Sequence, residues 1–168
     1  MRSTIKIVIL LFFICTSMSG ASFPDMEKYM RQHALIWEQL PMQWNEGAFL
    51  GNGLVGMMVY ADSTLNALVF HLGRPDVTDH RKAPYRKTSI GTEEADKMVD
   101  FCRLDVGKML LFPEGKILSG TFYLDIYNAE LTGHLKTDKG DLTFHAYTPQ
   151  PEEVNIVEVS SGVPYRWK

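Results

Sequence analysis

The chain has little cysteine, no long hydrophobic run and no cluster of basic residues. Only two of its 168 residues are cysteines, Cys15 and Cys102. No apolar run reaches the length of about eighteen residues that a membrane-spanning helix needs, so we expect no membrane span. Nucleic acids and anionic lipids are bound through concentrated positive charge, which this sequence does not offer. A neutral ligand fits the composition better.

The first 21 residues have the pattern of a signal peptide. A basic start is followed by an apolar run over residues 7–15 and then by small residues, and we expect cleavage after Ala21. A lipid anchor on Cys15 is the second interpretation, although Ile14 is larger than the residue expected before a lipidated cysteine. A buried N-terminal strand is the third. The first interpretation predicts a secreted or periplasmic protein.

Removal of this leader changes the charge and the cysteine content. It takes two of the 17 basic residues and none of the 20 acidic ones, which leaves 15 against 20 and a balance of −5. Cys102 is then the one remaining cysteine, so an internal disulfide is excluded even though export would permit one.

The rest of the chain divides into a linker, residues 22–33, and a β-domain, residues 34–168. Short apolar or alternating segments bounded by turn residues indicate strands. They cover residues 54–60, 66–72, 109–112, 122–127, 131–135, 142–146 and 154–159, with a further short apolar run at 34–37. Residues 92–102 are the best helix candidate, with Thr92 able to cap its start, and residues 22–32 are either a linker or a short frayed helix. Strands at this spacing predict an antiparallel two-sheet sandwich, which we expect to be incomplete, with one short helix.

Three glycines, Gly51, Gly53 and Gly56, have the G-x-G-x-x-G spacing of a dinucleotide-binding loop. Such a loop holds pyrophosphate because a strand precedes it and a helix follows it. Residues 41–47 do not resemble a strand, and residues 54–60 lead into another strand. We therefore predict no dinucleotide and no other cofactor. Gly51, Asn52 and Gly53 are predicted to form a structural turn, and Gly56 a bulge or a close backbone approach.

The neighbourhood of this loop is more specific than the loop itself. It contains Ile36-Trp37, Pro41-x-x-Trp44-x-x-Gly47 and Leu50-Gly51-Asn52-Gly53-x-x-Gly56-x-x-Val59. These residues resemble the start of the N-terminal domain of glycoside hydrolase family ninety-five, best known for α-L-fucosidases. Residues 103–107 and 122–130 also resemble that domain, and the similarity extends over about residues 36–159. The sequence departs from the family at Phe49, where the family has proline, and over residues 69–74.

The resemblance implies a domain that acts on glycans, with α-L-fucosides as one candidate. In the family the catalytic groups lie in a helical barrel that follows the sandwich, and no residue here matches them, so no catalytic residue is assigned. The expected partners are a glycan or that helical catalytic domain. Two further readings stay open: a stand-alone carbohydrate-binding or surface module, and the product of a broken gene.

A polar segment, residues 73–89, is the candidate binding site. Its candidate substrate-binding residues are Arg74, Asp76, His80 and Arg81, because such side chains make directed hydrogen bonds with sugar hydroxyls. Two other interpretations compete with this one. The segment could be held together by its own salt bridges, or Asp76 and Asp79 could form a carboxylate pair for catalysis.

A tryptophan and the histidines are the other residues with possible roles in a site. Trp44 could stack on a sugar ring or act as a packing anchor. The histidines lack the spacing of metal ligands, so no metal site is expected. His134 and His145 lie on predicted neighbouring strands and are expected to be polar surface residues.

Overall fold

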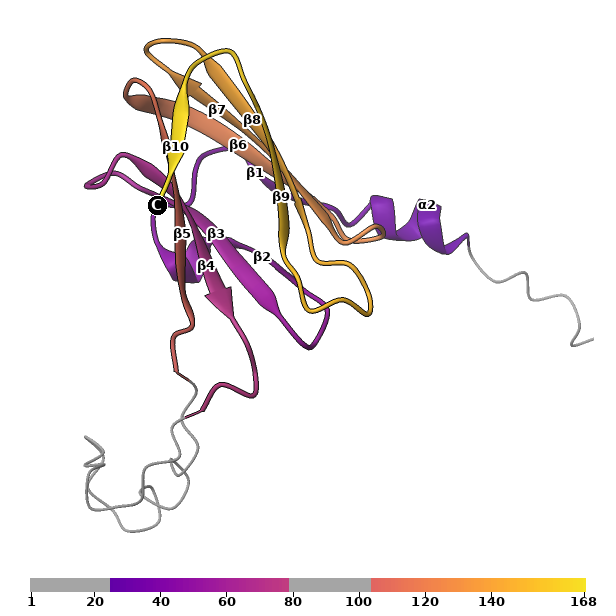
Figure 1. Cartoon of the computed structure of the whole chain (residues 1–168). Helices are drawn as coiled ribbons and strands as arrows, with labels where there is room; N and C mark the ends of the chain where they lie inside the picture. Colours follow the sequence, from indigo (N-terminus) through magenta and orange to yellow (C-terminus); the bar gives the residue numbers. More distant parts are fainter. Residues whose placement is uncertain (1–24, 79–103) are drawn as a thin grey trace, which may run out of the picture.

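The computed structural model describes residues 25–78 and 104–168, which fold into two five-stranded antiparallel sheets packed face to face (Figure 1). The predicted mainly β, two-sheet sandwich is confirmed. The helix predicted over residues 92–102 and the signal peptide lie outside the described residues.

The chain passes three times between the two sheets, after β1, after β5 and after β9. The first sheet has the order β1 (Leu35–Trp37), β6 (Ile117–Asp125), β7 (Glu130–Thr137), β8 (Asp141–Tyr147) and β9 (Ile156–Ser161). The second has the order β10 (Tyr165–Trp167), β5 (Gly107–Pro113), β4 (Ala67–Gly73), β3 (Gly56–Asp62) and β2 (Ala48–Gly51). Each sheet therefore combines strands from early and late parts of the chain.

Most strands follow the predicted period of two, since alternate residues enter the space between the sheets. Along β7 and β8 the buried side chains include Leu131, Leu135, Leu142, Phe144 and Ala146. The turn between β3 and β4 occupies residues 63–66, and β3 begins and ends two residues later than expected. Strands β2 and β10 were not predicted, because each has four residues or fewer.

Three phenylalanines join the sheets at the centre of the core. The ring of Phe144 meets Phe70 of the second sheet and Phe122 of its own sheet edge to face, with centroids 5.4 and 5.5 Å apart. Gly133 makes this possible, because a Cβ there would lie 1.9 Å from the ring of Phe144. The small residue on β7 thus creates the space for the large one on β8.

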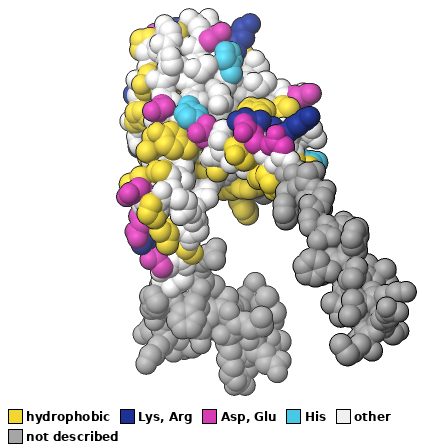
Figure 2. Space-filling model, turned by 90° about the vertical axis from the view of Figure 1, so that its right-hand side faces the viewer, with side chains coloured by type: hydrophobic (Ala, Val, Ile, Leu, Met, Phe, Trp, Pro, Cys, Tyr) yellow, Lys and Arg dark blue, Asp and Glu magenta, His cyan; other side chains and the backbone are white. Residues whose placement is uncertain are grey.

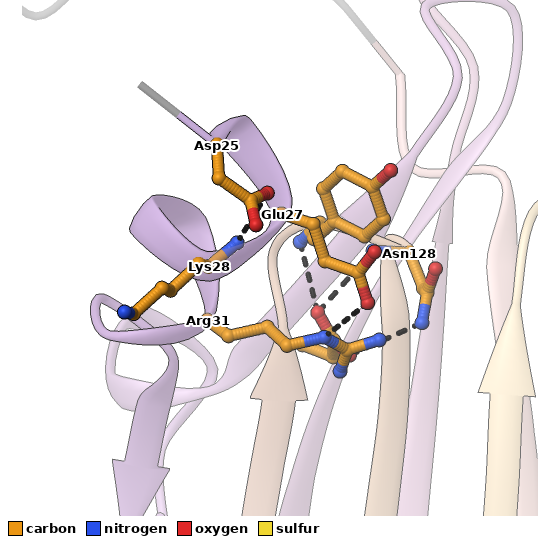
Figure 3. A network of polar contacts seen from close by, with 7 residues as sticks. Asp25, Glu27, Lys28, Arg31 and Asn128 are labelled. Atoms are coloured by element: carbon orange, nitrogen blue, oxygen red, sulfur yellow. Dashed lines mark hydrogen bonds and ion pairs between the residues drawn. The ribbon is translucent and has the colours of Figure 1, made fainter.

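The predicted linker contains a short helix, α2 (Met26–Arg31), which is fixed to the sandwich by one arginine (Figure 3). Asp25 caps the helix by accepting a hydrogen bond from the backbone N–H of Lys28 at 3.2 Å. Arg31 donates to Oδ2 of Asp125, on the end of β6, at 2.5 Å, and also pairs with Glu27. The short helix is therefore held against the end of β6 and the β6–β7 turn.

Asp125 is one of few buried polar side chains, with 6% of its surface exposed. Burial opposes its ionisation, but hydrogen bonds from the backbone N–H groups of Asn128 and Tyr127 and the charge of Arg31 outweigh that effect. The pKa of Asp125 consequently lies below its ordinary value.

Candidate functional site

The glycine-rich stretch forms the β2–β3 hairpin. Gly51 ends β2 and is paired with Gly56, the first residue of β3, and Gly53 has a positive φ of 89°. A Cβ on Gly56 would lie 2.7 Å from the carbonyl oxygen of Leu50. The predicted structural turn and close backbone approach are confirmed, although Gly51 itself is extended. A strand follows the loop, so no helix N-terminus faces it.

Asn52, at the tip of this hairpin, ties the two sheets together. Its Nδ2 donates to the carbonyl oxygens of Pro149 at 2.8 Å and Glu152 at 2.7 Å, both in the β8–β9 loop. Its Oδ1 accepts from the backbone N–H groups of Leu54 and Val55 at 2.9 and 3.1 Å. The amide thus makes two donated and two accepted hydrogen bonds within the protein, which explains why an asparagine stands between the two glycines.

A groove of about 920 Å³ opens at the end of the second sheet, beside this hairpin. Its walls come from β2, β3 and β4 and from the segments on either side of residues 79–103. The side chains that matter for its chemistry are Trp44, Phe49, Met58, His71, Arg74, Leu104 and Asp105. Its volume is within the range of small-molecule sites.

Two exposed aromatic side chains give the groove an apolar wall. Trp44, on the short 3-10 helix η1 (Trp44–Glu46), is 63% exposed, and Phe49 on β2 is 55% exposed. Phe49 is paired with Met58 and Met58 with His71, so these three side chains form a row across three strands on the face turned away from the core. At this exposure Trp44 is not a packing anchor of the core.

A histidine–aspartate pair lies at the end of this row. His71 Nε2 is 2.8 Å from Oδ1 of Asp105, which also accepts a hydrogen bond from the backbone N–H of Gly107 at 3.0 Å. The hydrogen bond with His71 is the main reason why the pKa of Asp105 is lowered. The pair therefore presents an ionised carboxylate next to an imidazole in a mostly apolar groove.

Arg74 and Asp76, two of the four predicted substrate-binding residues, lie together at the rim of the groove. Arg74 donates from Nε and Nη2 to the two carboxylate oxygens of Asp76, at 2.7 and 3.0 Å, and from Nη1 to Glu153 at 2.5 Å. This pairing raises the pKa of Arg74 and lowers that of Asp76. It matches the alternative interpretation of a loop held by its own salt bridges. His80 and Arg81, like Asp79, lie outside the described residues.

Sequence reasoning missed Phe49, His71 and Asp105 as members of one site. The signal that would have revealed them is strand register, because Phe49 and His71 come together only when β2 pairs with β3 and β3 with β4. Because β2 was not predicted, Phe49 was noted only as a departure from the family pattern and was given no place in a sheet.

The outer face of the first sheet is polar and carries the two remaining predicted surface histidines. His145 lies between Glu130 and Glu158, with N–O distances of 3.3 and 3.2 Å, and His134 is exposed on the neighbouring strand. Figure 2 shows histidine, acidic, basic and hydrophobic side chains interspersed on one face of the molecule.

Among the described residues no group of three or more histidine, cysteine, aspartate or glutamate side chains is placed to hold a metal ion. Within the same residues, no helix has the length and apolar character to cross a bilayer.

Comparison with known protein families finds no matching family model, and comparison with curated proteins finds no match. What the groove can bind therefore follows from the chemistry of its side chains. Its aromatic wall can stack on an apolar ring face, and its ionised carboxylates can accept hydrogen bonds. The carboxylates of Asp76 and Asp105 both have lowered pKa values, so neither is suited to donate a proton near neutral pH.

Proposed function

We propose that this chain is the N-terminal β-sandwich module of a glycoside hydrolase, exported by its leader, and that it binds glycan without cleaving it. The family resemblance around residues 36–59 supports the hydrolase context, with α-L-fucosides as one candidate substrate. In that context cleavage belongs to a helical barrel, which the 168 residues do not include. The module would hold the glycan or the catalytic domain in place.

The groove is the observation that carries the binding role. Sugar rings present C–H faces that pack on aromatic side chains and hydroxyl edges that need hydrogen-bond partners. Trp44 and Phe49 supply aromatic surfaces for the ring faces. The His71–Asp105 pair, at the end of the Phe49–Met58–His71 row, supplies hydrogen-bond partners for the hydroxyls. Neighbouring strands are about 4.8 Å apart, so the row spans roughly 10 Å, the length of about two sugar units.

Cleavage by these residues is disfavoured by the same geometry. An inverting glycosidase needs one protonated and one ionised carboxyl group on opposite sides of the scissile bond. Here Asp105 is bound to His71 and Asp76 to Arg74, and each partner favours the ionised form. Both carboxylates can therefore accept hydrogen bonds from hydroxyls, but the general acid is missing from the described part of the groove.

Titration with neutral oligosaccharides, including fucosylated ones, tests the proposal. We expect a dissociation constant on the order of 0.1 mM, or about −5.5 kcal/mol, followed by tryptophan fluorescence and by amide chemical shifts. Replacing Trp44 or Phe49 with alanine should weaken binding about tenfold or more, because each removes a stacking surface. Tyr123→Ala is the matched control, since Tyr123 is an exposed aromatic on the first sheet.

The proposal fails if no oligosaccharide shifts the amides of β2, β3 and β4, or if Tyr123→Ala weakens binding as much as Trp44→Ala.

A second candidate function is favoured by the exposed Leu104 and Val106 near the groove, which extend its apolar surface. In that case the groove would dock the helical catalytic domain itself. Co-expression with such a domain would then give a stable complex that Phe49→Asp disrupts.

A further inference from the structure

The second sheet has another pocket at the opposite end of β5 from the groove, and it contains an arginine without an acidic partner. This pocket has a volume of about 470 Å³ and lies between the β3–β4 turn, the end of β5 and the start of β10. Its apolar lining consists of Leu65, Phe112, Pro113, Pro164 and Tyr165. Arg166 and Glu114 are its charged residues.

Arg166 differs from the other two arginines in the described residues. Arg31 is paired with Glu27 and Asp125, and Arg74 with Asp76 and Glu153. Within residues 25–78 and 104–168, the guanidinium of Arg166 has no carboxylate partner. It lies instead over the ring of Phe112, with its Cζ 4.4 Å from the ring centroid.

Stacking of this kind fixes the guanidinium without using its hydrogen-bond donors. The Cζ atom of the group lies over the aromatic face, and its N–H groups have no carboxylate partner among the described residues, so they can meet a planar oxyanion through two bonds. Strand pairing places Arg166 opposite Phe112, so the backbone keeps the two side chains next to each other.

Two other polar side chains of the pocket, Glu114 and Asn66, already have partners within the protein. Glu114 accepts a hydrogen bond from Lys139 Nζ at 2.6 Å, so its negative charge is offset next to the pocket. Asn66 uses its amide to donate to the carbonyl oxygen of Gly115 and to accept from the N–H of Ile117. The uncompensated charge in the pocket is the single positive charge of Arg166.

We infer that this pocket binds a carboxylate carried on a ring-shaped body, with Arg166 holding the carboxylate and the proline and tyrosine side chains packing against the ring. An acidic sugar unit of a glycan has this chemistry, and that identification of the source rests on the proposed function. The carboxylate site itself does not, since Trp44 and the groove lie at the other end of the sheet.

Titration of the full chain with sodium glucuronate, glucose, cyclohexanecarboxylate and inorganic phosphate tests this inference. Binding is followed through the Nε–Hε signal of Arg166 and the amides of residues 112–114 and 164–166. We expect saturable shifts with glucuronate and with cyclohexanecarboxylate, and at least tenfold weaker ones with glucose and phosphate. Tighter binding of glucuronate identifies an acidic sugar as the source; tighter binding of cyclohexanecarboxylate overturns that identification.

Four variants separate the role of the arginine from general charge, from folding and from the groove. Arg166→Gln should weaken glucuronate binding at least tenfold, and Phe112→Leu should weaken it by removing the stacking surface. Lys136→Gln removes an exposed positive charge from the first sheet and should leave binding unchanged. Trp44→Ala should also leave it unchanged, so that failure of the groove proposal is seen separately. Equal binding of glucose and glucuronate, equal binding of phosphate, or unchanged binding by folded Arg166→Gln would each overturn the inference.

Discussion

Replacing Asn52 with aspartate separates its two roles, because the side chains have the same shape but aspartate cannot donate. The acceptor bonds from the N–H groups of Leu54 and Val55 would remain, and the turn would keep its form. The two bonds donated to the carbonyl oxygens of Pro149 and Glu152 would be lost. A negatively charged oxygen would then face those two carbonyl oxygens.

The size of the effect follows from the hydrogen bonds. Each neutral bond contributes about 1 kcal/mol net, and the one to Pro149 is partly buried, so losing both bonds costs about 2 kcal/mol. Repulsion between the carboxylate and the carbonyl oxygens adds about 1 kcal/mol, for a total of about 3 kcal/mol. For a domain of this size, that corresponds to a melting temperature lower by roughly 10 °C.

Urea unfolding followed by tryptophan fluorescence measures this difference, with Asn45→Asp as the control. Asn45 lies exposed on η1 and the same substitution there adds the same charge, so its stability should change by less than about 0.5 kcal/mol. Asn52→Ala, which loses all four bonds, should be about as unstable as Asn52→Asp. If Asn52→Asp is as stable as the unmodified chain, then Asn52 only shapes the turn and the inter-sheet tie is refuted.

Further expectations concern the core, acid stability, export and activity. Gly133→Ala should destabilise the fold by about 3 kcal/mol in urea unfolding, since its Cβ would overlap the ring of Phe144; an unchanged midpoint would contradict the packing. The pKa of Asp125 is lower in the folded state, so its stabilising effect is present above the ordinary carboxyl pKa and is lost as pH falls through the folded value. Asp125→Asn should accordingly flatten the acid limb of the stability–pH curve, and an identical curve would count against that role. N-terminal sequencing of exported material should begin at Ser22, whereas intact Met1 in cytoplasmic material would oppose export. Purified chain should not hydrolyse aryl fucosides or galactosides, and turnover that survives repurification would place catalysis within these residues.

The sequence was sufficient for the class of fold because the central strands are strongly patterned. Leu131, Leu135, Leu142 and Phe144 alternate with polar residues, and an antiparallel sandwich buries one face of many such short strands. The predicted strands at 131–135 and 142–146 likewise became the adjacent antiparallel strands β7 and β8. The edge strands β2 and β10 escaped prediction because three or four residues carry too little periodicity to identify them.

The site was harder to predict because it depends on pairing between distant segments. Residues 73–89 were predicted to form the site because they are rich in charged residues. In the structure Arg74 is paired with Asp76 and with Glu153, which is far along the chain. The groove instead depends on Phe49 and Asp105, which come together with His71 only through register and loop geometry. Neither the strand register nor the loop geometry can be predicted from local composition.

The placement of β10 has a consequence for the order in which the protein can be assembled. Trp167 of β10 reaches the ring of Phe70, with centroids 5.7 Å apart, and β10 supplies the last strand of a sheet whose other members are β2 to β5. While the chain emerges from the ribosome or the export machinery, those four strands can pair early, but one edge of their sheet stays open until residue 167 is released. A nascent chain stalled before that point would expose both the free edge of β5 and part of the Phe70 ring. Such intermediates are the ones that chaperones bind and that aggregate when chaperones are scarce.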